Sequence, residues 1–96
     1  MDTNISTKEI SKNYQNNWNI GRITKVKYMG GYKLKITFEN NTTTTINFEP
    51  YLKQNPLYKP YLNIKKFLTF YIEDNGALHW KGNNLDFHYT QLLNWK

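Results

Sequence analysis

The chain has 96 residues, no cysteine, and a formal net charge of +6 from 13 basic and 7 acidic side chains. This length suits one small domain, and the lack of cysteine excludes disulfides, thiolate zinc sites and cysteine nucleophiles. A small domain without disulfides favours the cytoplasm, and no apolar run has the length of a signal-peptide core or approaches the roughly 20 residues of a membrane helix.

The N-terminal residues carry a helix signal. Ser6 followed by Glu9 fits a capping box. Three large apolar side chains then recur every four residues, at Ile10, Tyr14 and Trp18. This spacing predicts a short helix over about residues 7–16. A frayed tail that docks only partly on the domain is the alternative.

Residues 22–48 alternate between apolar and polar side chains in three successive runs, as β-strands do. Gly30-Gly31 and Asn40-Asn41 separate the runs and are turn signals. The third run begins with four threonines, which favour extended backbone. We therefore expect three antiparallel strands with one shared apolar face, formed by Val26, Tyr28, Tyr32, Leu34, Ile36, Phe38, Thr44, Ile46 and Phe48.

All three prolines follow, within residues 50–60, where they exclude a ladder strand. Pro50 predicts a short helical turn that ends near Gln54, and Asn63 predicts the cap of a single turn through Lys66. The many apolar side chains of this stretch still need burial. We expect a packed connection that lies across an open end or face of the sheet.

Two further strands are expected over residues 67–73 and 77–81, joined by the hairpin signal Asn75-Gly76. After them the sequence predicts a helix from about Phe87 to Asn94, with Asp86 as its cap.

The predicted fold class is therefore α+β. It combines a small antiparallel sheet of about five strands with a short N-terminal helix, a proline-rich connection and a C-terminal helix. We expect residues 1–19 to form an N-terminal extension with the short helix, and residues 20–96 to form a single α+β domain.

The order of these signals resembles a bacterial family known as domain of unknown function 2442, over about residues 20–93. The resemblance lies in an alternating strand, a strand that ends before Pro and Leu, a proline-containing connection, and a last strand with Trp before a Leu-Asp pair. The matching residues are Tyr32, Leu34, Ile36, Phe38, Phe48, Pro50, Leu52, Tyr58, Pro60, Phe67, Trp80, Gly82, Leu85 and Asp86.

The chain also departs from the family's pattern. Asn40-Asn41 replaces the usual Asp-Gly turn, Phe87 stands where proline is common, and the stretch from Trp80 to Leu85 is one residue short. The resemblance implies a small α+β domain without a recognised activity. Such domains occur alone, fused to a helix-turn-helix, or beside another small protein in an arrangement similar to a toxin–antitoxin pair.

Both histidines lie in residues 78–89, with Asp86 between them. On a strand, His79 and Trp80 point to opposite faces, so Trp80 is expected in the core and His79 outside. The histidines lack the i, i+4 spacing of a helical zinc site. An acid–base pair of His88 with Asp86 is the enzymatic alternative, but no nucleophile or phosphate-binding loop accompanies it. We therefore expect a non-catalytic protein without a metal or cofactor.

The remaining signal is a basic surface. Lys25, Lys27, Lys33 and Lys35 fall on two adjacent predicted strands, opposite their apolar side chains, and Arg22 extends the set. Ordinary solvated charge is the alternative interpretation. Arg22 is the single arginine, so sequence-specific reading of DNA is not expected. Tyrosines of the proline-rich connection suit a protein interface, and the candidates for this role are Tyr58 and Tyr61.

Three functional hypotheses follow. The first is a small bacterial or phage protein that docks on and restrains a protein partner, such as an antitoxin or an anti-CRISPR-like inhibitor of a nucleic-acid-handling defence enzyme. The second is direct RNA or DNA binding by the lysine-rich face. The third is a small enzyme that uses His88 and Asp86. An uncovered sheet edge also invites a homodimer or another protein.

Overall fold

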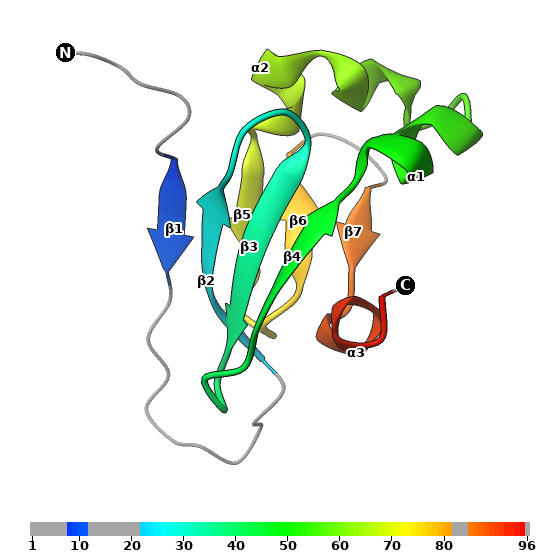
Figure 1. Ribbon diagram of the computed structural model, residues 1–96. Helices are drawn as coiled ribbons and strands as arrows, with labels where there is room; N and C mark the ends of the chain where they lie inside the picture. The colour runs from blue at the N-terminus through cyan, green and yellow to red at the C-terminus, as the bar shows by residue number, and fades with distance from the viewer. Residues whose placement is uncertain (1–7, 12–21, 82–84, 96) are drawn as a thin grey trace, which may run out of the picture.

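The computed structural model describes residues 8–11, 22–81 and 85–95. It has two layers of antiparallel strands, with short helices across one end of the layers (Figure 1). The four-stranded sheet has the order β1-β2-β3-β4, and the three-stranded sheet has the order β5-β6-β7. The fold class is thus α+β, as predicted, but the expected single sheet of about five strands is two sheets.

The four-stranded sheet follows the alternation of the sequence. Its strands are β1 (Glu9–Ser11), β2 (Ile23–Tyr28), β3 (Lys33–Phe38) and β4 (Thr43–Asn47). Both predicted turns contain left-handed backbone, with φ of 98° at Gly30 and 57° at Gly31, and 68° at Asn41. Two glycines, which carry no Cβ, and one asparagine therefore close these hairpins.

The prediction of an N-terminal helix is wrong for the part of it that the structure describes. Glu9–Ser11 is strand β1, and Ile10 lies opposite Val26 of β2. The backbone groups of β2 offer this segment a ladder of hydrogen bonds, and tertiary pairing overrides the weak helical pattern. Ser6, Tyr14 and Trp18 lie outside the described residues.

The three-stranded sheet consists of β5 (Phe70–Ile72), β6 (Leu78–Trp80) and β7 (Asp86–Phe87). The expected fourth strand starts later than predicted, because Phe67 still belongs to a helical turn. The Asn75-Gly76 turn is where the sequence placed it: Gly76 has a φ of 86°, and the Asn75 side chain accepts a hydrogen bond of 3.1 Å from the Ala77 amide. Asn75 thus holds its own hairpin turn.

The proline-rich connection forms three short helical turns, α1 (Glu49–Gln54), η2 (Lys59–Leu62) and α2 (Ile64–Phe67). Pro50 opens α1, and Asn63 caps α2 by accepting from the amides of Lys65 and Lys66, as predicted. Figure 1 shows these turns above the ends of the strands, where the sequence analysis expected the connection to pack. No helix in the described part of the chain is long and apolar enough to cross a membrane.

The C-terminal helix α3 (Tyr89–Leu93) is shorter than predicted, and Asp86 is not its cap. Asp86 belongs to β7, and His88 is the N-cap. The predicted helix began too early because Asp86 and Phe87 pair with β6 before the chain turns. The prediction used the propensity of aspartate for caps, and pairing with β6 decided otherwise.

The core lies between the two sheets and is rich in aromatic side chains. Trp80 is fully buried, as predicted, and its indole Nε1 donates a 2.6 Å hydrogen bond to the carbonyl of Phe67. The Trp80 ring contacts both sheets and the connection, with its nearest ring neighbours at Phe48, Tyr61, Phe67, Phe70 and Phe87. One indole therefore joins the end of β4, the connection and the three-stranded sheet.

The two sheets also meet at one corner. The amide of Ile23 donates to the carbonyl of Gly76 at 3.1 Å, which links the start of β2 to the turn between β5 and β6. The Arg22 side chain lies directly over Gly76, where a Cβ atom would come within 2.5 Å of Arg22 Cγ. Beside it, Arg22 Nε is 3.5 Å from Oε1 of Glu39, whose side chain is 4% exposed. A buried ion pair thus fixes this corner.

Candidate functional site

The outward face of the four-stranded sheet carries the predicted lysines. Lys25 and Lys27 are exposed on β2, and Lys33 and Lys35 are exposed on β3. Their neighbours in sequence, including Val26 at 0% exposure, are buried on the inward face. The structure therefore brings these four residues, called here the lysine face, to one side of one sheet, as the alternation predicted.

The register places two of these lysines directly opposite each other. Lys27 pairs with Lys35, whereas Lys25 pairs with Thr37 and Lys33 with Asn47. Like charges in directly opposite positions of a sheet repel and destabilise it. The pair with Lys35 therefore costs stability on one side of Lys27, while its other cross-strand neighbour, on β1, is Glu9.

One described carboxylate reaches the lysine face. Glu9 of β1 lies opposite Lys27, and its Oε2 is 3.9 Å from Nζ of Lys25. Both side chains of this ion pair are about half exposed, so water screens their attraction. A shallow hollow of about 170 Å³ lies between these side chains, lined by Glu9, Lys25, Lys27, Lys35, Thr37 and Thr43. The face therefore remains strongly basic around a small concavity.

Arg22, predicted to extend the lysine face, points elsewhere. Its side chain is 17% exposed and forms the ion pair with Glu39 at the corner of the two sheets. It covers Gly76 in the opposite sheet, so its role in the structure is to hold the corner. Glu39 lies beside Arg22 across the β2–β3 hairpin, where its amide donates to the Arg22 carbonyl. Sequence position alone could not reveal the contact of Arg22 with Gly76, which forms only when the two sheets pack.

The two candidate tyrosines also lie differently from the expectation. Tyr61 is fully buried, with its ring against Trp80, and its hydroxyl has no hydrogen-bond partner among the described residues. Tyr58 is half-buried and stacks on Tyr51, with ring centroids 5.2 Å apart and planes at 16°. Tyr61 is therefore a core residue, and Tyr58 retains part of its surface for contact.

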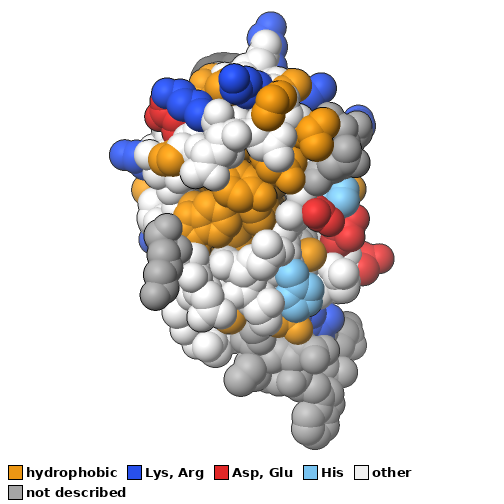
Figure 2. Space-filling view, turned by 90° about the vertical axis from the view of Figure 1, so that its right-hand side faces the viewer, with side chains coloured by type: hydrophobic (Ala, Val, Ile, Leu, Met, Phe, Trp, Pro, Cys, Tyr) orange, Lys and Arg blue, Asp and Glu red, His pale blue; other side chains and the backbone are white. Residues whose placement is uncertain are grey.

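Tyr51 and Trp95 border a second feature of the surface, a broad groove of about 570 Å³ between α1 and α3. Figure 2 shows a continuous hydrophobic area at the centre of this side of the molecule. Burial and a side-chain hydrogen bond to Tyr58 raise the pKa of Tyr51 to about 12, so its hydroxyl stays protonated at neutral pH. The groove's other lining residues are uncharged: Thr90, Gln91 and Asn94.

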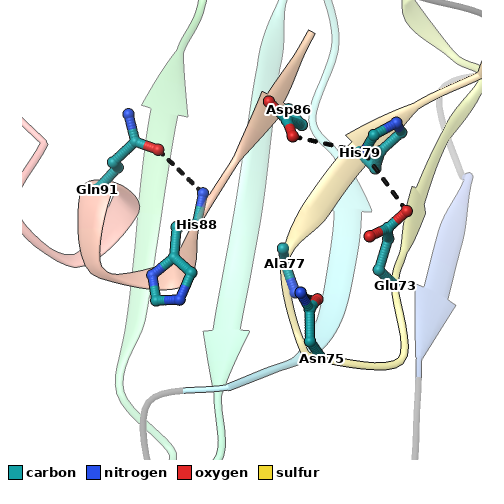
Figure 3. A network of polar contacts seen from close by, with 7 residues as sticks. All are labelled: Glu73, Asn75, Ala77, His79, Asp86, His88 and Gln91. Atoms are coloured by element: carbon teal, nitrogen blue, oxygen red, sulfur yellow. Dashed lines mark hydrogen bonds and ion pairs between the residues drawn. The ribbon is translucent and has the colours of Figure 1, made fainter. Parts of the chain in front are cut away.

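The outward face of the three-stranded sheet carries a row of polar and aromatic side chains, one from each strand. Tyr71 of β5 pairs with His79 of β6, which in turn pairs with Asp86 of β7. Figure 3 shows His79 between two carboxylates: its Nδ1 is 3.5 Å from Oε2 of Glu73 and 3.8 Å from Oδ2 of Asp86. His79 thus faces outward, as predicted, with two carboxylates within 4 Å of its ring nitrogen.

His88 and Asp86 are not brought together as an acid–base pair. The side chain of His88 points away from Asp86 (Figure 3) and accepts a hydrogen bond from the Thr90 amide. The His88 amide donates to Oε1 of Gln91 at 3.0 Å, which completes a capping box. Within the residues that the structure describes, no group of three or more His, Asp or Glu side chains has the geometry to hold a metal ion.

The grouping of Glu73, His79 and Asp86 was missed by sequence reasoning. The signal was present, because each of the three short strands alternates buried and outward side chains. What the sequence did not reveal was the register, since a two-residue strand such as β7 carries too little pattern to fix its pairing.

A comparison with known protein families shows which family the chain belongs to. The family model described as protein of unknown function (DUF2442) matches residues 23–96, and the chain therefore belongs to this family. The resemblance that the strand pattern indicated is thereby confirmed. Neither the curated proteins nor the solved structures contain a match to the chain.

Proposed function

We propose that this member of the DUF2442 family is a non-catalytic binding protein, which docks through its lysine face on an acidic surface of a protein partner and restrains that partner. A toxin-like protein or a nucleic-acid-handling defence enzyme in the cytoplasm is the class of partner that we favour. The protein would then act as an antitoxin or as a phage-type inhibitor acts, by occupying a surface without turnover.

The observation that carries this proposal is the direct pairing of Lys27 with Lys35 in a lysine face that has four ammonium groups and one described carboxylate. Their repulsion weakens the free protein, and it is relieved when an acidic surface covers the face. Complementary charge also accelerates association, because it steers the two surfaces toward each other.

Besides Glu9, four described carboxylates are paired away from the lysine face. Glu39 is buried against Arg22, and Glu49 forms an ion pair of 3.0 Å with Lys53 within α1. Glu73 and Asp86 flank His79 in the other sheet. Internal pairing therefore leaves the lysine face as a basic surface for an external partner.

A protein partner is favoured over single-stranded nucleic acid by the position of the aromatic side chains. Single-strand binders combine a basic groove with exposed rings on which bases stack. Here the aromatic residues of β2 and β3, Tyr28 and Phe38, are turned toward the core and are 5% and 0% exposed. Direct RNA or DNA binding through the lysine face remains the second candidate, and the experiment below separates the two.

The test is affinity capture from a lysate of the source organism with the tagged protein, with and without nuclease. The reversal variant is K27E/K35E. The matched control is K59E/K65E, which makes the same change of charge at two exposed lysines outside the lysine face. We expect one dominant protein that survives nuclease, is retained by the control variant and is lost with the reversal variant.

Three results would contradict the proposal. Retention of the partner by K27E/K35E would show that the lysine face is not the docking surface. Equal loss with K59E/K65E would show a response to net charge alone. Recovery of nucleic acid without protein, with steep loss of binding as salt rises, would assign the lysine face to RNA or DNA.

A further inference from the structure

The outer edge of β4 is a strand edge without a partner among the described residues. The ladder bonds of β4 to β3 fix which of its backbone groups point outward. The amide of Phe48 donates to the carbonyl of Tyr32, and the amide of Phe38 donates to the carbonyl of Thr42, so even-numbered residues face β3. The amides and carbonyls of Thr43, Thr45 and Asn47, here called the β4 edge, therefore point away from the sheet.

The β4 edge lacks the devices that usually protect a sheet from pairing with another chain. Such devices are prolines, charged side chains, bulges or a very short strand. β4 consists of three threonines, an isoleucine and an asparagine, and its register with β3 is continuous over five residue pairs. By contrast, β1 has three residues and carries the charged Glu9, β5 has three residues and β7 has two.

The lysine face adjoins this edge. Lys33 lies opposite Asn47, and Lys35 lies opposite Thr45, so two lysines stand one strand inward from the β4 edge. All three side chains of the edge residues are exposed on the same side as these lysines. A strand added at β4 would therefore place its own outward side chains next to those of Thr43, Thr45 and Asn47, on the same side of the sheet as the lysines.

We propose that the β4 edge takes an extended acidic segment of the protein partner as an additional antiparallel strand. This inference rests on the proposed function, since it names the part of the partner that contacts the lysine face. Main-chain hydrogen bonds to Thr43, Thr45 and Asn47 supply the register, and alternate acidic side chains supply the specificity.

The spacing of strands in a sheet suits this arrangement. A residue opposite Thr45 on the added strand would lie two strands, about 10 Å, from Lys35, because neighbouring strands are about 4.8 Å apart. Glutamate and lysine side chains together span that separation. The intervening side chains of β4 on this face are short and uncharged, so they leave the path between the charges open.

A second copy of the chain fits the β4 edge less well. Pairing β4 with β4 would place the Lys33 and Lys35 of both copies on the same face of one continuous sheet. Like charges would then accumulate across the new junction, whereas an acidic strand would neutralise them. Charge complementarity therefore selects an acidic segment as the occupant.

The probe for this proposal is a short synthetic peptide in which glutamate and valine alternate, added to the isotopically labelled full chain. In an antiparallel pair, the peptide residues opposite Thr43, Thr45 and Asn47 direct both their backbone groups and their side chains toward the proposed partners. We expect slower hydrogen exchange at the amides of Thr43, Thr45 and Asn47, and little change at Thr44 and Ile46.

Modified peptides serve as controls that leave the protein untouched. Methylation of the glutamate amides should weaken binding by about tenfold or more, because these amides face β4, whereas methylation of the valine amides should leave binding intact. A peptide with glutamine in place of glutamate should bind more weakly. On the protein side, Thr45→Pro removes an outward amide and leaves the ladder to β3 in place.

Each outcome decides the question. Protection of the β4 edge that Thr45→Pro abolishes supports the proposal. No protection at millimolar peptide, or equal binding of both methylated peptides, overturns it. Protection that grows with protein concentration in the absence of peptide makes a second copy the occupant and overturns it as well. Capture of the cellular partner by Thr45→Pro but not by K27E/K35E would overturn this inference and leave the proposed function intact.

Discussion

In both sheets, apolar side chains at alternate positions point inward. The outward faces of the two sheets differ in how their charged side chains are paired. On the four-stranded sheet, Lys27 lies opposite Lys35, and the nearest described carboxylate is half exposed on β1. On the three-stranded sheet, His79 lies between the carboxylates of Glu73 and Asp86. One face gathers four lysines around a single described carboxylate, and the other gathers two carboxylates around one histidine.

This difference in charge pairing distinguishes outward side chains that stabilise the fold from outward side chains that could bind a partner, which the sequence alone does not distinguish. Polar side chains at alternate positions of a strand indicate an outward face, whether they serve the fold or a partner. The pairing across strands tells the two apart, because a self-balanced row stabilises the sheet and a row of like charges weakens it. The lysine face is therefore the better candidate for an interface.

The largest expected effect concerns the core that both sheets share. Trp80→Ala removes the ring between the sheets and leaves the Phe67 carbonyl without its indole donor. We expect a loss of about 4 kcal/mol in the free energy of unfolding, measured by urea titration. Trp95→Ala, at a half-buried ring, should cost clearly less. Separate unfolding transitions for strands of the two sheets would contradict a shared core.

The next effect concerns the corner where the sheets meet. Arg22→Met leaves the Glu39 carboxylate buried beside an apolar side chain, and we expect a loss of about 3 kcal/mol in unfolding free energy. The double variant R22M/E39L should recover most of that loss, because a buried ion pair is often replaceable by apolar side chains. A double-mutant cycle without coupling would show that Arg22 and Glu39 do not stabilise each other at this corner.

A smaller effect separates the turns of the two sheets. Gly76 and Gly31 both have positive φ, but only at Gly76 would a Cβ atom collide with a neighbour, at 2.5 Å from Arg22 Cγ. Gly31→Ala should cost about 1 kcal/mol from backbone strain alone, and Gly76→Ala about 2 kcal/mol or more. Thermal unfolding of both variants measures the difference. Equal losses would show that Arg22 moves aside freely.

The smallest effect addresses the outward faces directly. Neutralising both members of the lysine pair, in K27Q/K35Q, should raise the unfolding free energy by about 0.5 kcal/mol and flatten its dependence on salt. His79→Gln on the other sheet removes the imidazole between Glu73 and Asp86 and should lower the unfolding free energy by a similar amount. A loss of stability in K27Q/K35Q would remove the contrast between the faces.

The sequence predicted local features well and long-range ones poorly. The alternation of β3, the helical turn at Pro50 and the cap at Asn63 depend on neighbouring residues, and each was confirmed. Strand β1 was mistaken for a helix because its partner, β2, lies more than a dozen residues away. The division into two sheets was missed for the same reason, since no local pattern records which strands are adjacent.

The candidate site shows the same limit. The four lysines share a face because alternation within a hairpin is a local property. Arg22 and Tyr61 were assigned to the surface by composition and position, yet contacts with Glu39 and Trp80 hold them inside. Asp86 was read as a cap, although its strand register turns it toward His79. Contacts between segments distant in the sequence therefore determined the position of each of these three residues.

The burial of Trp80 also gives the molecule an intrinsic optical probe. Its indole is fully buried in an apolar environment with Tyr61 and four phenylalanines as neighbours, so its emission should lie well to the blue of a solvated tryptophan. Excitation energy absorbed by nearby tyrosines should transfer to the same ring, because Tyr61 is 6.5 Å away. In a variant with Trp18 and Trp95 replaced by phenylalanine, Trp80 is the single tryptophan. Its emission wavelength and intensity would follow the packing of the two sheets during folding, in real time.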